Sequence, residues 1–197
     1  GSVGEFYAKR FLEKQYLSQP ENIKVDIKDV HDVPHYQRKG IDLLVDVYKQ
    51  NGSIHRILFE VKNDSYTTNN LFAETVSNAE TGTKGCVFTS EAHWWLYIYE
   101  NQDRAIMFNP KELADFVKST TKNYRKVTLM NTTSITGQPF KTYGVLIPVA
   151  DVVKYVPSAR EIRIPIRAMA KELGIDMKRF DSFKKYKSCI DEFPYKV

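Results

Sequence analysis

Three residues in the first third of the chain have types and spacing that suit phosphate chemistry. Asp42 begins one apolar run, and Glu60 and Lys62 end the next. Mg²⁺ takes oxygen ligands and is commonly held by one or two carboxylates. A lysine beside such an ion can orient or deprotonate a water, or stabilise charge that develops on a phosphate. Because charged residues are common at strand ends, a surface ion cluster explains the spacing equally well.

A β-hairpin formed by residues 41–49 and 55–62 is predicted to bring these residues together. A three-residue loop, with Gly52 in the left-handed conformation of a bulge, gathers the apolar side chains on one face. A two-residue loop would mix charge into that face, and a one-residue slip inverts the pattern. The favoured register sets Asp42 opposite Glu60, where two carboxylates repel unless a cation lies between them. The apolar face then consists of Leu43, Val45, Val47, Ile57, Phe59 and Val61.

The segments Gly40-Ile41-Asp42 and Phe59-Glu60-Val61-Lys62 resemble the motif of the PD-(D/E)XK nuclease superfamily. In that family an acidic residue begins one strand and (D/E)-x-K ends the next. Ile41 stands where the family has proline, a variation that leaves Asp42 in its role. The resemblance covers residues 3–90. It implies an α/β fold with a restriction-endonuclease-like αβββαβ core, a mixed central sheet and flanking helices, followed here by a C-terminal extension.

The resemblance also implies a role for each motif residue. Asp42 and Glu60 would ligate Mg²⁺ or Mn²⁺ together with the backbone carbonyl of Val61, and Lys62 would be the catalytic lysine. Glu5 precedes the motif on a helix, as an extra acidic residue does in many members, including archaeal-type Holliday junction resolvases. It would be an auxiliary ligand to the metal or to water. From the residues alone, Glu5 is explained nearly as well as a first-turn acid favoured by the helix dipole.

Basic residues in two places suit a polyanionic partner. Gln37, Arg38 and Lys39 precede Asp42 in a polar loop and are candidate contacts to phosphate. The second place is a basic run with interleaved aromatic residues at 178–187, which contains Lys184 and Lys185. A charge run is more commonly a solvated face of the protein, so the composition leaves both interpretations open.

The elements expected around the motif alternate helix and strand. An amphipathic helix is predicted at 3–18, with Ala8, Leu12 and Tyr16 in a buried stripe that Glu5 continues. We expect residues 1–118 to form the nuclease core and residues 119–197 to pack on it as a basic extension. A further residue, Glu74, either faces the site or is solvated. The other strands are expected at 23–30, 86–89, 94–99, 105–108, 126–130 and 144–149, and the other helices at 71–78, 110–117 and 166–173.

Composition narrows the function classes. The 197 residues contain 29 Lys+Arg and 24 Asp+Glu, a formal net charge of +5 that weakly favours a polyanion. No apolar run approaches the ~18 residues of a membrane span. Two cysteines without metal-ligand spacing favour a reducing, cytoplasmic location. The motifs of Walker-type, dinucleotide-binding, α/β-hydrolase and zincin proteins are missing from the sequence.

We therefore expect a cytoplasmic, metal-dependent nuclease that hydrolyses phosphodiester bonds, with DNA as the favoured substrate. One alternative is a Holliday-junction-type resolvase, which would have to be a symmetric homodimer to cut paired strands. An RNA endonuclease is the second alternative, because nothing in the sequence separates DNA readers from readers of the 2′-hydroxyl. The third is a nucleic-acid-binding module that has the fold without turnover.

Overall fold

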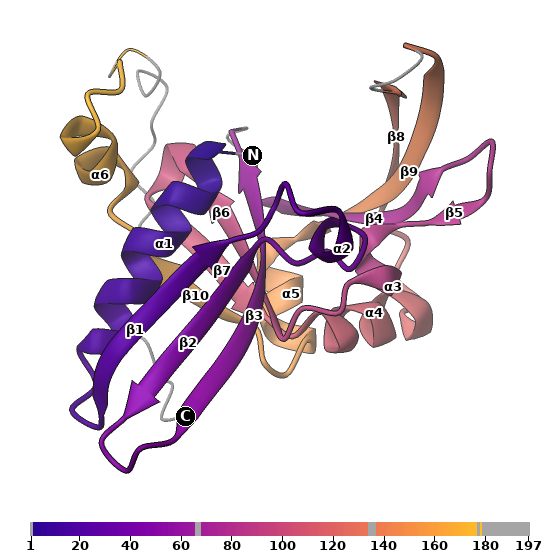
Figure 1. The fold of residues 1–197 in the computed structure, drawn as a ribbon. Helices are drawn as coiled ribbons and strands as arrows, with labels where there is room; N and C mark the ends of the chain where they lie inside the picture. Colours follow the sequence, from indigo (N-terminus) through magenta and orange to yellow (C-terminus); the bar gives the residue numbers. More distant parts are fainter. Residues whose placement is uncertain (1, 66–67, 134–136, 177, 179–197) are drawn as a thin grey trace.

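A mixed six-stranded sheet forms the centre of the molecule (Figure 1). The computed structural model describes residues 2–65, 68–133, 137–176 and 178. The strand order is β1-β2-β3-β6-β7-β10, and all neighbours are antiparallel except β3 and β6, which are parallel. The six strands are β1 (Asn22–Asp29), β2 (Leu43–Lys49), β3 (Ile54–Asp64), β6 (Trp94–Tyr99), β7 (Arg104–Phe108) and β10 (Arg160–Arg163).

A second, antiparallel sheet extends away from the first and has the order β5-β4-β9-β8. Its outer hairpin, β8–β9, projects beyond the body of the molecule in Figure 1. The four strands are β4 (Asn70–Asn78), β5 (Thr83–Lys84), β8 (Arg125–Thr132) and β9 (Pro139–Pro148).

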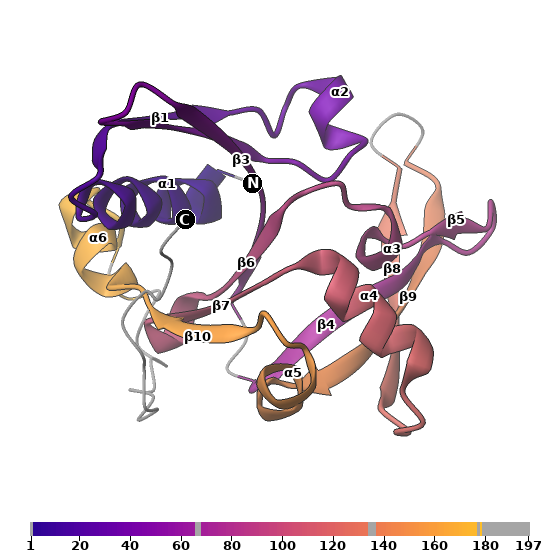
Figure 2. The same ribbon diagram turned by 90° about the horizontal axis from the view of Figure 1, so that it is seen from below.

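Helices cover both faces of the central sheet. In Figure 2 the sheet curves around α1 (Ser2–Leu17), and α6 (Ile166–Glu172) lies beside it. The short helices α3 (Cys86–Thr89) and α5 (Val149–Tyr155) lie with α4 (Pro110–Ser119) on the other side. Two smaller turns complete the fold, α2 (Pro34–Gln37) and the 3-10 turn η1 (Glu100–Gln102). None of the helices in the described ranges has the length and apolar character needed to cross a membrane.

The register predicted for the β2–β3 hairpin is confirmed. Leu43 pairs with Phe59, and Asp46 pairs with Arg56, whose guanidinium donates two hydrogen bonds of 2.7 Å to the Asp46 carboxylate. Gly52 has φ +82°, as a left-handed loop residue requires. The predicted apolar face belongs to one core cluster together with the side of α1 that carries Ala8, Leu12 and Tyr16.

Two predicted elements are wrong. Residues 71–78 form strand β4 instead of a helix, because Leu71 and Ala73 are buried in alternation and the segment pairs with β9 along its length. Residues 86–89 form one turn of helix, α3, instead of a strand. The β-branched and aromatic residues there favour a strand locally, but tertiary context decides at this length. The connection from β3 to the parallel strand β6 therefore consists of the β4–β5 hairpin and α3.

Residues beyond 118 contribute to both sheets. Strand β9 pairs with β4 through contacts such as Leu71–Ile147, and β10 forms the edge of the central sheet against β7. The side chains of Ile147 and Val152 complete one core cluster, and those of Ile162 and Ile166 complete the other. The chain before and after residue 118 thus shares its sheets and its cores.

Candidate active site

Asp42, Glu60 and Lys62 lie at one end of the central sheet, where β1 ends and β2 begins. Glu60 and Lys62 belong to β3, and Asp42 lies one residue before β2. The Lys62 ammonium lies 2.6 Å from Glu60 Oε1. Glu60 is almost fully buried, with 3% of its side chain exposed, whereas 38% of the Lys62 side chain is exposed. The carboxylate of this ion pair is inside the protein, and the Lys62 side chain is partly exposed.

The position of Asp42 differs from the expected pairing with Glu60. The β2–β3 ladder stops at the pair of Leu43 and Phe59, so Asp42 and Glu60 are not a ladder pair. The Asp42 N–H donates to the Phe59 carbonyl (2.8 Å), and Asp42 Oδ2 accepts a hydrogen bond from the Val61 N–H (2.7 Å). Strand β2 begins only at Leu43. The Asp42 side chain is therefore bonded to the Val61 backbone on β3 instead of lying opposite Glu60.

Gly40 shapes the entry to this site. Its φ of +61° lies in the left-handed region that favours glycine. A β-carbon at this position would lie 2.7 Å from Glu60 Oε2, so the Gly40 backbone forms the wall against which the Glu60 carboxylate packs. On the same wall, Ser90 Oγ donates to the Gly40 carbonyl (3.3 Å) and accepts a hydrogen bond from Trp95 Nε1 (2.9 Å).

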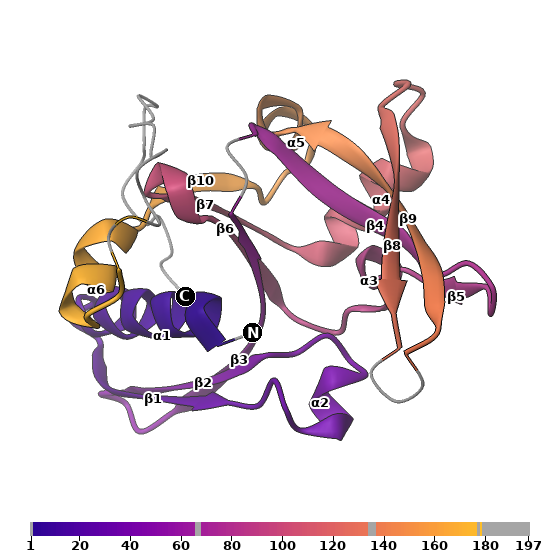
Figure 3. The same ribbon diagram turned by 90° about the horizontal axis from the view of Figure 1, so that it is seen from above.

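Glu5 is buried next to these residues, as the helical stripe predicted. The first turn of α1 lies beside β3 in Figures 1 and 3. The approach is close, because a β-carbon on Gly4 would lie 2.8 Å from Asn63 Cβ. Glu5 is 6% exposed, and Asp42 is near enough to raise its pKa. Glu5, Asp42, Glu60 and Lys62 therefore lie near one another, and the fifth predicted site residue, Val61, lies between Glu60 and Lys62 with its N–H bonded to Asp42.

Burial dominates the protonation of the acidic groups. It raises the pKa of Glu5, Asp42 and Glu60 above their usual values. Lys62 opposes this effect at Glu60 and at Asp42. Burial alone would disfavour the Lys62 ammonium, but the Glu60 carboxylate outweighs it and the pKa of Lys62 is raised. The site therefore favours a lysine that stays protonated among carboxylates that gain from any further positive charge.

The donor set fits a hard divalent cation in its chemistry. Glu5 Oε2 and Glu60 Oε2 are buried, and neither has a hydrogen-bond partner among the described residues. Buried carboxylate oxygens without partners are costly, and Mg²⁺ or Mn²⁺ prefers oxygen ligands. These carboxylates do not form a metal-ligand set in this structure, because no three acidic, histidine or cysteine side chains in the described ranges are arranged to hold a metal ion. Glu60 would have to share its carboxylate between the ion and Lys62.

The candidate phosphate contacts have different surroundings. Gln37 and Arg38 are exposed beside the site, at the end of α2. Lys39 makes an ion pair of 2.8 Å with Glu91, so a phosphate would have to compete with that carboxylate. Lys184 and Lys185 lie outside the described residues.

His31 and its two aspartates were not assigned to the site from the sequence. The Val30 N–H donates to the Asp42 carbonyl, so the next residue, His31, lies near Asp42. His31 Nδ1 lies 2.5 Å from Asp29 Oδ1, and Nε2 lies 3.1 Å from Asp32 Oδ1. The hydrogen bond to Asp29 raises the pKa of His31. The feature that would have placed His31 near the site is the antiparallel pairing of β1 with β2, which brings the end of β1 next to Asp42.

Cys86 lies near Lys62, and Glu74 contacts Cys86. Glu74 lies on β4, and its Oε1 accepts a hydrogen bond from the Cys86 N–H (3.2 Å), which ties β4 to the start of α3. Burial raises the pKa of the Cys86 thiol to about 12, although Lys62 opposes the shift. The thiol is therefore protonated at neutral pH and is a poor nucleophile.

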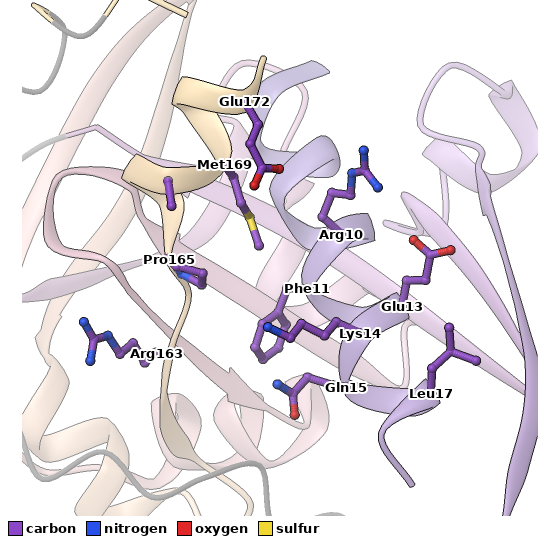
Figure 4. A pocket seen from close by; sticks show the side chains of 11 residues that line it. Arg10, Phe11, Glu13, Lys14, Gln15, Leu17, Arg163, Pro165, Met169 and Glu172 are labelled. Carbon is purple, nitrogen blue, oxygen red and sulfur yellow. The ribbon is translucent and has the colours of Figure 1, made fainter. Parts of the chain in front are cut away.

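A cavity of about 530 Å³ lies away from the acidic residues, between α1 and α6 (Figure 4). Phe11 and Lys14 border it from the C-terminal half of α1, and Met169 and Glu172 border it from α6. Glu5 lies in the first turn of α1 and does not line this cavity.

Comparison of the chain with protein-family models, curated proteins and solved structures gives no match.

Proposed function

We propose that this protein is a Mg²⁺- or Mn²⁺-dependent nuclease with a restriction-endonuclease-like core, acting on phosphodiester bonds in DNA in the cytoplasm. The observation that carries the proposal is the convergence of Glu5, Asp42, Glu60 and Lys62 at one end of the sheet. The unpartnered buried oxygens of Glu5 and Glu60 support a cation at this place. The mixed α/β sheet, with α1 before three antiparallel strands and β6 parallel to β3, is compatible with that core.

Each residue has a role that follows from its surroundings. Asp42 and Glu60, with the Val61 carbonyl, would hold the cation, and Glu5 would complete the acidic ligands. When bound, the cation would polarise the scissile phosphate and lower the pKa of the attacking water. Lys62 is held protonated by Glu60, so its role is to orient the water and to stabilise charge on the phosphate rather than to act as a base.

The basic residues beside the site would hold the substrate. Gln37 and Arg38 are exposed at the end of α2, and their side chains would contact phosphate oxygens. Lys39 would exchange its Glu91 partner for phosphate. Contacts of this kind position the backbone and carry no sequence information, so they predict a strong dependence of binding on salt.

A cleavage assay on supercoiled plasmid and on a linear single strand, with Mg²⁺, Mn²⁺ or EDTA, tests the proposal. We expect nicking that needs the metal, and calorimetry should detect Mg²⁺ binding that disappears in Glu60→Gln. Metal binding without cleavage of either DNA would overturn the choice of substrate and favour a branched or RNA substrate. If the protein neither binds the metal nor cleaves either DNA, the enzyme proposal is overturned, and a nucleic-acid-binding module is favoured.

A further inference from the structure

One stretch of the chain accounts for the whole of its excess positive charge. Residues 116–150 contain five lysine and arginine residues and no aspartate or glutamate. The net charge of the whole chain is +5, so the remainder of the chain is formally neutral. The stretch begins in α4 and includes the β8–β9 hairpin. A cation excess confined to one element is the electrostatic signature of contact with a polyanion.

The cations of the hairpin itself are exposed and are not paired with acids in the part of the chain that the structure describes. Lys122, which precedes β8, forms an ion pair of 3.0 Å with Asp151. By contrast, Arg125, Lys126 and Lys141 form no salt bridge among the described residues. All three are exposed on the two strands. They can therefore contact phosphate without giving up a carboxylate.

Two of these cations share one face of the hairpin. Lys141 pairs with Met130 and lies on the same side of the hairpin. Lys126 is four residues before Met130 on β8, so it lies on that side as well. Seven of the eight residues on this face are exposed, and none is acidic. We call it the lysine face; it consists of Lys126, Thr128, Met130 and Thr132 from β8 and Pro139, Lys141, Tyr143 and Val145 from β9.

The lysine face is the outward continuation of a face that packs on the protein core. Alternate side chains of β9 point to one side, so Lys141 and Tyr143 extend the row that begins with Ile147 and Val145. Ile147 is buried in a core cluster with Leu71, and Val145 packs against that cluster. The ladder between β4 and β9 ends at Tyr143. Beyond it the hairpin is two strands wide among the described strands and projects from the body (Figure 1).

The sheet that carries the hairpin is anchored next to the acidic residues. The Gly85 N–H donates to the Thr75 carbonyl on β4 (2.9 Å). Helix α3 follows, and Ser90, directly after it, donates to the Gly40 carbonyl beside Glu60 (3.3 Å). One short segment, residues 85–90, thus connects the second sheet with the wall of the acidic site.

We propose that the β8–β9 hairpin is a DNA-binding arm whose lysine face lies in the major groove of a B-form duplex. The inference deepens the proposed function, on which the choice of DNA rests. A two-stranded antiparallel ribbon fits the major groove, which is about 12 Å wide. Lys126 and Lys141 would contact phosphate oxygens. The hydroxyls of Thr128 and Thr132 would face base edges, and Met130 would contact the methyl groups of thymine.

Other nucleic acids fit the lysine face less well. The major groove of A-form RNA is deep and narrow, and side chains cannot read it. Single strands are bound by successive aromatic side chains on which the bases stack. Tyr143 is the one aromatic residue of the lysine face. A DNA duplex is therefore the polyanion that this face fits.

Fluorescence anisotropy in EDTA measures duplex binding without metal or cleavage. Met130→Glu places an acid beside Lys141 and should weaken binding to a DNA duplex at least about tenfold. Leu129→Glu is the matched control, because Leu129 is the adjacent exposed residue and lies on the opposite face. It should weaken binding less than about threefold. Equal losses in these two variants, with both folded by circular dichroism, would overturn the proposal.

The salt dependence of binding tests the two lysines. Each phosphate contact contributes about 0.9 to the slope of log K against log salt concentration. The double variant Lys126→Gln/Lys141→Gln should therefore lower the slope by about 2. Lys14→Gln/Lys171→Gln removes the same charge from exposed positions on α1 and α6, which lie across the molecule from the hairpin in Figure 1, and should leave the slope unchanged. Equal slopes for the parent and the hairpin variant would overturn the proposal.

Competition identifies the groove. Methyl green, which binds the major groove, should displace the protein from the duplex, whereas netropsin, which binds the minor groove, should not. Displacement by netropsin alone, or tighter binding to single-stranded DNA or to duplex RNA than to duplex DNA, would overturn the proposal. Failure of the nuclease proposal has a different outcome. Duplex binding through the hairpin without metal-dependent cleavage would support the arm and count against the enzyme.

Discussion

The Lys62 ammonium and the Glu60 carboxylate form an ion pair of 2.6 Å in which the acid is buried and the Lys62 side chain is partly exposed. The carboxylate is held inside the protein next to Gly40, and the ammonium is held against the Glu60 Oε1 oxygen. The ion pair also keeps the lysine charged, because Glu60 raises its pKa despite burial.

The stability of the metal-free protein should increase when Asp42 is neutralised. Burial raises the pKa of Asp42 above its usual 3.8, so the folded state holds this proton more tightly than the unfolded state does. The stability that this carboxyl contributes is present below pH 3.8 and is lost as pH rises through the folded pKa. In EDTA at pH 7, Asp42→Asn should melt higher, by about 2–4 °C for each ~1 kcal/mol gained.

The gain from Asp42→Asn should disappear as pH falls below 3.8, where the parent carboxyl becomes protonated in both states. Mg²⁺ should stabilise the parent, by ~2.7 kcal/mol at a concentration of 100 Kd, and should have little effect on the variant. Asp26→Asn is the control, because Lys24 lowers the pKa of this partly exposed acid, and removal of the Asp26 charge should give no gain. If Asp42→Asn melts below the parent at pH 7 in EDTA, the Asp42 carboxylate does not destabilise the metal-free protein, and the account of this site is contradicted.

Gly40→Ala should impair the site itself. The methyl group would meet Glu60 Oε2 at 2.7 Å, and alanine at φ +61° costs about 1–2 kcal/mol. Gly52→Ala is a matched control, because Gly52 has φ +82° but no atom within 4 Å of an added β-carbon. Chemical denaturation should show a loss of stability in both variants, larger in Gly40→Ala because of the clash, whereas cleavage and Mg²⁺ affinity should fall only in Gly40→Ala. Equal activity in the two variants would separate Gly40 from the function of Glu60.

His31 should set the acidic limit of activity. Burial raises the pKa of Glu5 and Asp42, and the charge of His31 partly offsets this effect. His31→Gln removes that charge, so the pH at which cleavage rises should move upward. His35→Gln, an exposed histidine on α2, should leave the profile in place. A pH–rate profile in Mg²⁺ measures both; superimposable profiles for parent and His31→Gln would exclude His31 from the electrostatics of the site.

The hairpin and the first helix could be predicted from the sequence because the spacing of apolar residues in each fits a single arrangement. A shift by one residue would move those apolar side chains out of the core. The alternation around Leu43 and Phe59 admits a single register, and the stripe through Ala8 and Leu12 carries Glu5 into the interior. Once the register is set, the charged residues at the ends of the two strands, Asp42, Glu60 and Lys62, must lie at the same end of the hairpin. These local constraints are sufficient to bring the acidic residues and Lys62 together.

The region after the motif could not be predicted because its structure depends on partners distant in the chain. Strand β4 is stabilised by β9, which lies about seventy residues later, and the Leu71–Ile147 contact has no local signal. The exact placement of Asp42 was also missed, since the bend at Gly40 ends the ladder at Leu43. His31 joins the site through the β1–β2 pairing, which a motif centred on β2 and β3 does not include.

The most direct test of the proposed function compares cleavage by the parent, Lys62→Met and Lys84→Met in Mg²⁺. Lys84 is an exposed lysine on β5 and serves as the control for loss of a positive charge. The methionine side chain keeps most of the length of Lys62, and calorimetry would establish that Mg²⁺ still binds. We predict that Lys62→Met loses at least 100-fold in rate, the scale of one electrostatic catalytic group, while Lys84→Met cuts like the parent. Cleavage by Lys62→Met at the parental rate would contradict the account.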